Sequence, residues 1–188
     1  MACSGRSVKT TSQPVSSTSS SFFQAETKIS SPVKRDYEQA LIYMQNANYV
    51  QAEKVFKRVI GAQNNLAGPY INMGIIRLKE GKLEEAEKYF LSANEKNASN
   101  ADVQNYLGII YRQQGRFTEA ESAYKKAIQQ KPEFAKAYLN LGVLYDLYMG
   151  NYPAALNNYR QYQVFRPNDK RVKGWIVDLN QRMQASNL

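Results

Sequence analysis

The stretch Leu107–Tyr124 reads LGIIYRQQGRFTEAESAY, and Leu141–Tyr159 reads LGVLYDLYMGNYPAALNNY. Both stretches contain a Leu-Gly pair, then a Tyr, a second Gly, an Ala and a closing Tyr in the same order. Between the first Tyr and the second Gly, the earlier copy has RQQ and the later copy has DLYM. One added residue rotates the rest of a helix by about 100°. We therefore expect the later copy to contain either a π-bulge or a longer turn.

The pattern extends beyond these two copies with a fixed period. Gly74, Gly108 and Gly142 are spaced by 34 residues. A small residue and an aromatic residue follow the same period: Ala52, Ala86 and Ala120, and Phe56, Phe90 and Tyr124. A period of this length indicates one helical hairpin per repeat. Glycine inside a helix costs about 1 kcal/mol relative to alanine, so we expect a neighbouring helix to approach too closely for a Cβ.

The period divides the chain into segments. Pro132 ends the copy that spans residues 101–134. After the last copy, helical spacing continues in Val172, Trp175, Ile176 and Leu179. The expected segments are a tail over residues 1–31, repeats over about 33–66, 67–100, 101–134 and 135–169, a capping helix over 170–184 and a short tail over 185–188.

The copy at residues 101–134, with its Leu-Gly, Tyr, Ala, Tyr and Pro series, resembles the tetratricopeptide repeat family. The resemblance covers about residues 33–169. It implies an all-α fold, a right-handed α-solenoid of about four helix hairpins closed by a capping helix. It also implies a non-enzymatic adaptor that binds a peptide or partner segment on the concave face, which the first helices of the repeats line.

The expected partner-binding residues lie on the side of the first helices opposite the Leu, Gly and Tyr positions. Asparagine offers a donor and an acceptor for an extended backbone, and Lys and Arg suit an acidic segment or a C-terminal carboxylate. The alternative is an ordinary solvated helix face. The set is Asn72, Lys79, Asn105, Tyr106, Arg112, Lys136 and Asn140.

The extra residue in the last copy brings Leu147, Tyr148 and Met149 to a place where the preceding copy has glutamines. One interpretation is packing, in which a wider helix pair is filled by Tyr162 and covered by the capping helix. The other is an exposed aromatic patch that contacts a partner.

The composition argues against catalysis. The chain of 188 residues contains no His and one Cys, and no nucleophile–base pair or metal-binding motif is apparent. We expect no enzyme activity, cofactor or metal. Lys and Arg number 25 against 16 Asp and Glu, giving a net charge of +9. Because this excess is scattered along the chain, we do not expect nucleic-acid binding.

Residues 1–31 are rich in Ser and Thr, and we expect a disordered tail or tether. Ala2-Cys3-Ser4 resembles a bacterial lipoprotein processed before an acylated Cys, which would require an apolar leader before Cys3. The resemblance implies an outer-membrane anchor on the periplasmic side. The alternative is a free thiol in a cytoplasmic protein.

More weakly, the C-terminal region is similar to small tetratricopeptide lipoproteins of bacterial envelope machines, such as pilus or secretin pilot proteins and partners of TonB-type systems. This resemblance implies an alternative role. The chain would then be a structural assembly factor acting through its tail and its aromatic C-terminal end.

Overall fold

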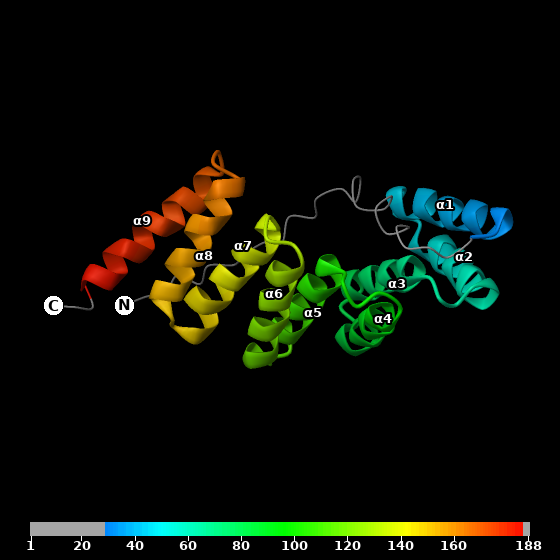
Figure 1. Cartoon of the computed structure of the whole chain (residues 1–188), viewed down its shortest axis with the longest axis horizontal. Coiled ribbons are helices and arrows are strands. Elements are labelled where there is room, and N and C mark those ends of the chain that lie inside the picture. Colours follow the sequence, from blue (N-terminus) through cyan, green and yellow to red (C-terminus); the bar gives the residue numbers. More distant parts are fainter. Residues whose placement is uncertain (1–28, 186–188) are drawn as a thin grey trace. The chain divides into compact units, whose positions relative to one another are not determined.

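The computed structural model describes residues 29–185, and the chain divides into two compact units at residues 64 and 65. Every regular element in the described part of the chain is helical (Figure 1). The helices form consecutive hairpins, which confirms the expected all-α solenoid of helix pairs.

The N-terminal unit contains one hairpin, α1 (Ser31–Gln45) and α2 (Tyr49–Ala62). Helix α1 begins at Ser31, and Ser30 is its N-cap residue. The Pro in the first turn is tolerated because N–H groups there have no partner within the helix. The hairpin packs through Tyr37 and Phe56, whose ring centroids are 5.7 Å apart.

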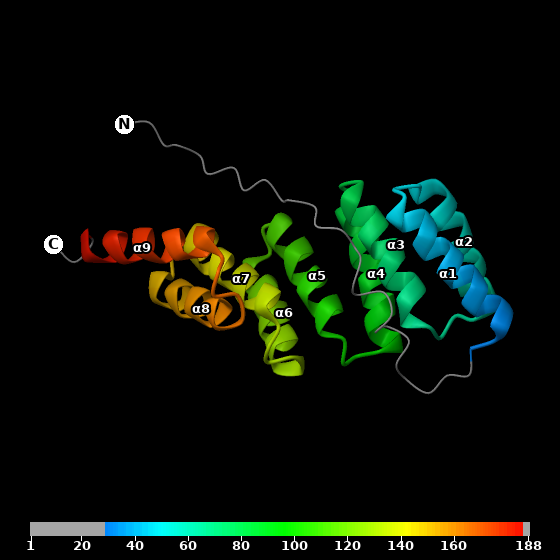
Figure 2. The same ribbon diagram turned by 90° about the horizontal axis from the view of Figure 1, so that it is seen from above.

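The C-terminal unit contains three hairpins and a closing helix, which follow one another in chain order (Figures 1 and 2). The elements are α3 (Ala67–Lys79), α4 (Leu83–Lys96), α5 (Ala101–Gln113), α6 (Phe117–Gln130), α7 (Ala135–Leu144), the π-helical segment η2 (Tyr145–Met149), α8 (Tyr152–Phe165) and α9 (Lys170–Ala185).

The turns inside the hairpins place one residue in the left-handed backbone region. Gly81, Gly115 and Gly150 have φ values of 75°, 76° and 64°. Ala47 occupies the corresponding place in the first hairpin with a φ of 55°. Glycine adopts this conformation without a Cβ clash, so the first hairpin makes the same turn with a less suitable residue.

The repeated glycines lie against the repeated aromatic rings, as expected from the period. A Cβ built on Gly108 would lie 2.5 Å from the ring of Tyr124, and one on Gly142 would lie 2.6 Å from Tyr159. Tyr124 is completely buried. The close neighbour is therefore the ring of an aromatic residue on the second helix of the same repeat.

The extra residue of the last repeat is absorbed by η2, hereafter the π turn. Of the two expected outcomes, the π-bulge is the one observed. The π turn directs Asp146 inward, where it is buried, and leaves Leu147, Tyr148 and Met149 exposed.

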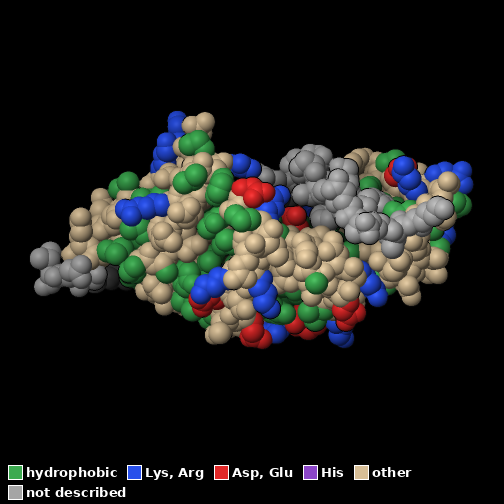
Figure 3. All heavy atoms as spheres, in the orientation of Figure 1, with side chains coloured by type: hydrophobic (Ala, Val, Ile, Leu, Met, Phe, Trp, Pro, Cys, Tyr) green, Lys and Arg blue, Asp and Glu red, His purple; other side chains and the backbone are tan. Residues whose placement is uncertain are grey.

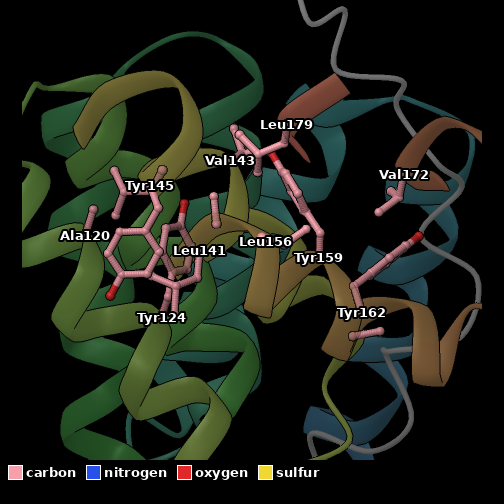
Figure 4. Packing of buried hydrophobic residues seen from close by; sticks show 13 residues of the cluster. Ala120, Tyr124, Leu141, Val143, Tyr145, Leu156, Tyr159, Tyr162, Val172 and Leu179 are labelled. Atoms are coloured by element: carbon pink, nitrogen blue, oxygen red, sulfur yellow. The ribbon is translucent and has the colours of Figure 1, made fainter. Parts of the chain in front are cut away.

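The last repeat and α9 share one hydrophobic cluster (Figure 4). Val172 and Leu179 of α9 are completely buried, and Tyr162 points toward Val172. Trp175 of α9 lies against Tyr159, with ring centroids 5.6 Å apart. Helix α9 thus covers an apolar face of the last repeat. Hydrophobic side chains also gather on the visible surface over α7–α9 (Figure 3).

Candidate partner-binding surface

Two of the expected asparagines meet between the first helices of successive repeats. The Nδ2 of Asn140 on α7 donates to the Oδ1 of Asn105 on α5 at 2.9 Å. This bond leaves the amide NH₂ group of Asn105 and the amide oxygen of Asn140 without a side-chain or backbone partner among the described residues. Asn105 is buried and Asn140 is half-buried. The pair therefore presents a matched donor and acceptor between α5 and α7.

Tyr106 is held in place by packing. Its ring stacks on Phe90 with centroids 4.8 Å apart and an interplanar angle of 13°. Burial raises the pKa of Tyr106 to about 12, and the charge of Asp102 adds to the shift. Tyr106 is thus a neutral, half-buried side chain next to Asn105 in α5.

Asp102 was not among the residues singled out from the sequence, although it lies one helical turn before Asn105 and Tyr106. Burial raises the pKa of its carboxyl, and the charges of Lys131 and Lys136 oppose this rise. A sequence signal existed, since residues three and four apart share a helix face. We define the α5–α7 surface as Asp102, Asn105, Tyr106, Lys136 and Asn140.

Asn72 and Lys79 lie on α3, the first helix of the preceding repeat. Asn72 is buried, and its Nδ2 donates to the backbone oxygen of Gly68 in its own helix at 2.9 Å. Lys79 is exposed at the end of α3. The bond between Asn140 and Asn105 thus joins two of the three expected asparagines, and the third, Asn72, donates to its own helix.

Arg112 and Tyr148 come together, although the sequence placed them in two separate candidate surfaces. The guanidinium carbon of Arg112 lies 5.7 Å from the centroid of the Tyr148 ring, within the range of a cation–π interaction. The Tyr148 ring also lies against Phe117, with centroids 5.2 Å apart. The π turn thus brings an aromatic side chain of the last repeat onto the preceding repeat.

This second region combines exposed apolar side chains with buried polar atoms. Leu147, Tyr148 and Met149 are 41%, 47% and 39% exposed. Beside them, the Nε of Arg112 and the hydroxyl of Tyr124 are buried and have no hydrogen-bond partner. Burial raises the pKa of Tyr124, and the positive charge of Arg112 opposes this rise.

Other expected features stand as follows. Cys3 and residues 1–28 of the N-terminal tail lie outside the described residues, and the last residue of the expected tail, Ser31, begins α1. Within residues 29–185, no group of three or more His, Cys, Asp or Glu side chains could hold a metal ion. No helix in this part of the chain has both the length and the apolar character needed to cross a bilayer.

The paired helices with their fixed period define a helical repeat protein. A family model described as "Tetratricopeptide repeat" matches residues 67–99, and one described as "TPR repeat" matches residues 108–147. Over these residues the chain contains tetratricopeptide repeats, as the sequence resemblance implied. Repeats of this family are generally non-enzymatic scaffolds, which supports a protein-interaction adaptor. Among curated proteins, no sequence matches the chain.

Solved structures with the same fold have low sequence identity to this chain. The structure titled "Functional Characterization of Pseudomonas Aeruginosa pilF" has 21% identity and a TM-score of 0.73, over 81% of this chain and 69% of that chain. A crystal structure of MamA has 20% identity and a TM-score of 0.70, over 77% and 84%. The first TPR of Spaghetti (RPAP3), bound to the HSP90 peptide SRMEEVD, has 19% identity and a TM-score of 0.60, over 63% and 95%.

Proposed function

We propose that the chain is an adaptor that captures a segment of a partner protein on the α5–α7 surface. The observation that carries this proposal is the bond between Asn140 and Asn105, which leaves the NH₂ group of Asn105 as a donor and the amide oxygen of Asn140 as an acceptor between two helices. A peptide unit also has one donor and one acceptor. The asparagine pair can therefore bind a backbone without selecting its side chains.

Two cationic side chains lie near this surface. Lys136 is exposed beside the pair, and Arg112 lies seven residues after Asn105, on nearly the same side of α5. These cations suit an acidic segment. The first TPR of Spaghetti, which has a similar fold, binds the HSP90 peptide SRMEEVD, and this peptide contains three acidic residues.

The test is a titration of the partner against a double variant, Asn105→Ala with Asn140→Ala. Each lost hydrogen bond is worth about 0.5–1.5 kcal/mol, so binding should weaken roughly tenfold or more while helicity stays unchanged. The matched control is Asn157→Ala with Gln161→Ala, two exposed positions on α8. Equal affinity of the two double variants would contradict the proposal.

The location of the adaptor is a second part of the proposal. The Ala2-Cys3-Ser4 motif and the Ser- and Thr-rich residues after it suit an acylated Cys3 and a tether on the periplasmic side of a bacterial outer membrane. The test is the mass of the N-terminal fragment from the chain isolated from its native cells. An acyl mass on Cys3, and release of Cys3→Ser from the membrane fraction, are the expected results. An unmodified thiol would instead favour a cytoplasmic protein.

A structural assembly factor of an envelope machine is the second candidate function. The exposure of Leu147, Tyr148 and Met149 favours it, because exposed neighbouring apolar side chains mark interaction sites. In this case Tyr148→Ala with Met149→Ser would abolish partner capture, and the Asn105 and Asn140 double variant would retain it.

A further inference from the structure

Arg112 differs from the other partly buried arginines in the described part of the chain. Arg77, Arg116 and Arg182 each lie 2.7–2.9 Å from a carboxylate oxygen. Arg112 has no carboxylate within ion-pair distance among the described residues, and its Nε is buried without an acceptor. A buried donor without an acceptor is unfavourable. Arg112 is therefore a cation with no carboxylate partner among the described residues, and the polar group beside it is the hydroxyl of Tyr124.

The surroundings of Arg112 are apolar and open to solvent on one side. The π turn places Tyr148 against the guanidinium and leaves Leu147 and Met149 exposed beside it. Phe117 supports the Tyr148 ring from the start of α6. These four apolar side chains would exclude water from a group bound to Arg112, and exclusion of water strengthens a charged hydrogen bond.

We propose that Arg112 and the π turn form a binding site for a carboxylate side chain, Asp or Glu, flanked by apolar residues on a segment of a partner protein. The proposal rests on the proposed adaptor function and adds the chemistry of the bound segment. The planar guanidinium pairs with a carboxylate through two parallel hydrogen bonds. The apolar neighbours of that carboxylate would cover Leu147, Tyr148 and Met149.

A polyanion such as a nucleic acid fits this site less well. The nearest basic side chains in sequence, Arg116 and Lys125, are already paired with carboxylates. Arg116 binds Glu87 at 2.9 Å and Glu119 at 2.6 Å, and Lys125 binds Glu121 at 2.6 Å. Among the described residues, the cations that follow Arg112 most closely in sequence are thus already paired, and a single carboxylate matches the charge of Arg112.

The experiment selects peptides on the full chain from two display libraries of random sequence, one with a central Glu and one with a central Gln. The Glu library should be enriched, with apolar residues beside the Glu. The most enriched peptide and its Glu→Gln version are then the probes for titration. Arg112→Gln should weaken the Glu peptide at least about tenfold. Tyr148→Ala should weaken it several-fold.

Matched controls and a double-mutant cycle make the test specific. Arg160→Gln removes an exposed arginine of α8, and Val164→Ala removes a valine that is 68% exposed; both should leave affinity unchanged. The change Glu→Gln in the peptide should cost affinity for the native protein but very little for Arg112→Gln. A full cost in both proteins, or equal enrichment of the two libraries, would overturn the proposal.

The outcomes also separate this proposal from the proposed function. If selected peptides lose affinity with the Asn105 and Asn140 double variant but ignore Arg112→Gln, the carboxylate site is wrong and the adaptor surface stands. If selected peptides ignore both sets of changes, both proposals fail. Displacement of the peptide by a single-stranded oligonucleotide, with binding of that oligonucleotide lost in Arg112→Gln, would overturn the carboxylate site in favour of nucleic acid.

Discussion

The guanidinium of Arg182 on α9 donates to the Oδ1 of Asp146 in the π turn at 2.7 Å. The hydroxyl of Tyr159 donates to the other carboxylate oxygen at 3.2 Å. The Asp146 side chain is only 3% exposed. Because the extra residue of the last repeat turns this carboxylate inward, the closing helix supplies the cation that it needs. The π turn and α9 therefore depend on each other.

Loss of Arg182 should destabilise the C-terminal unit. Arg182→Ala leaves a buried carboxylate with one donor, and removing one member of a buried pair costs about 3–5 kcal/mol. Since Arg182 itself is 36% exposed, we expect a smaller loss, of about 2 kcal/mol, in the free energy of unfolding measured with denaturant. Gln181→Ala, at an exposed neighbouring position, should change it by less than about 0.5 kcal/mol. Equal effects of the two variants would contradict the role of the ion pair.

Gly108→Ala should destabilise the same unit, because the new Cβ would lie 2.5 Å from the buried Tyr124 ring. We expect a loss of about 1–3 kcal/mol in chemical denaturation. Gly174→Ala in α9 is the control, since nothing lies within 4 Å of its Cβ position. Helix propensity should make that variant more stable, by about 0.5–1 kcal/mol. Stabilisation by both changes would show that Tyr124 can move aside.

Ala47→Gly should stabilise the N-terminal unit. Ala47 has a φ of 55° in the turn between α1 and α2, and this conformation costs an L-residue about 1–2 kcal/mol. Glycine removes that cost but loses more entropy on folding, so we expect a net gain of about 0.5–1 kcal/mol. Amide hydrogen exchange within α1 and α2 measures this gain. The reverse change, Gly81→Ala, places an L-residue at a φ of 75° in the turn between α3 and α4. It should therefore speed amide hydrogen exchange in α3 and α4.

The stability that Asp169 contributes should disappear in acid. The guanidinium of Arg171, with the Tyr162 hydroxyl, lowers the pKa of Asp169 to about 2. A lowered carboxyl pKa stabilises the folded state above the unfolded pKa of about 3.9, and this contribution is lost as pH falls from there through the folded pKa. Because the Arg171 side chain is 65% exposed and the pair is screened by solvent, Asp169→Asn should cost about 1 kcal/mol at pH 7 and almost nothing near pH 2.

A pH series of denaturant melts measures this difference. Tyr162→Phe should show a smaller loss of the same sign, because the Tyr162 hydroxyl donates to Asp169 at 2.9 Å while Arg171 remains. A cost of Asp169→Asn that stays constant from pH 7 to pH 2 would contradict the assignment.

Much of the fold was predictable because the residue preferences of helices and turns indicate the same helix pairs as the 34-residue period. The contact between Gly108 and Tyr124 recurs between Gly74 and Phe90 and between Gly142 and Tyr159. The position of the extra residue was also predictable. The conformation of the extra residue was not predictable. The buried Asp146 carboxylate is neutralised by Arg182, which is 36 residues away in sequence.

The candidate site was less predictable than the fold. Helical periodicity placed Asn105 and Arg112 on one side of α5, but contacts between helices decided their partners. Asn72 has the same residue type and repeat position as Asn140, yet it donates to its own helix. The contact between Arg112 and Tyr148 depends on the π turn, so no spacing rule for regular helices would have found it.

The most direct test of the adaptor surface is site-specific photo-crosslinking in the native cells. A photoreactive residue at Lys136, on the α5–α7 surface, is compared with one at Val164, an exposed position on α8. We expect Lys136 to form a discrete covalent adduct with a partner protein, and this adduct should be lost when Asn105→Ala and Asn140→Ala are added. Adducts from Val164 alone, or a Lys136 adduct that persists in the double variant, would contradict capture of a partner on the α5–α7 surface.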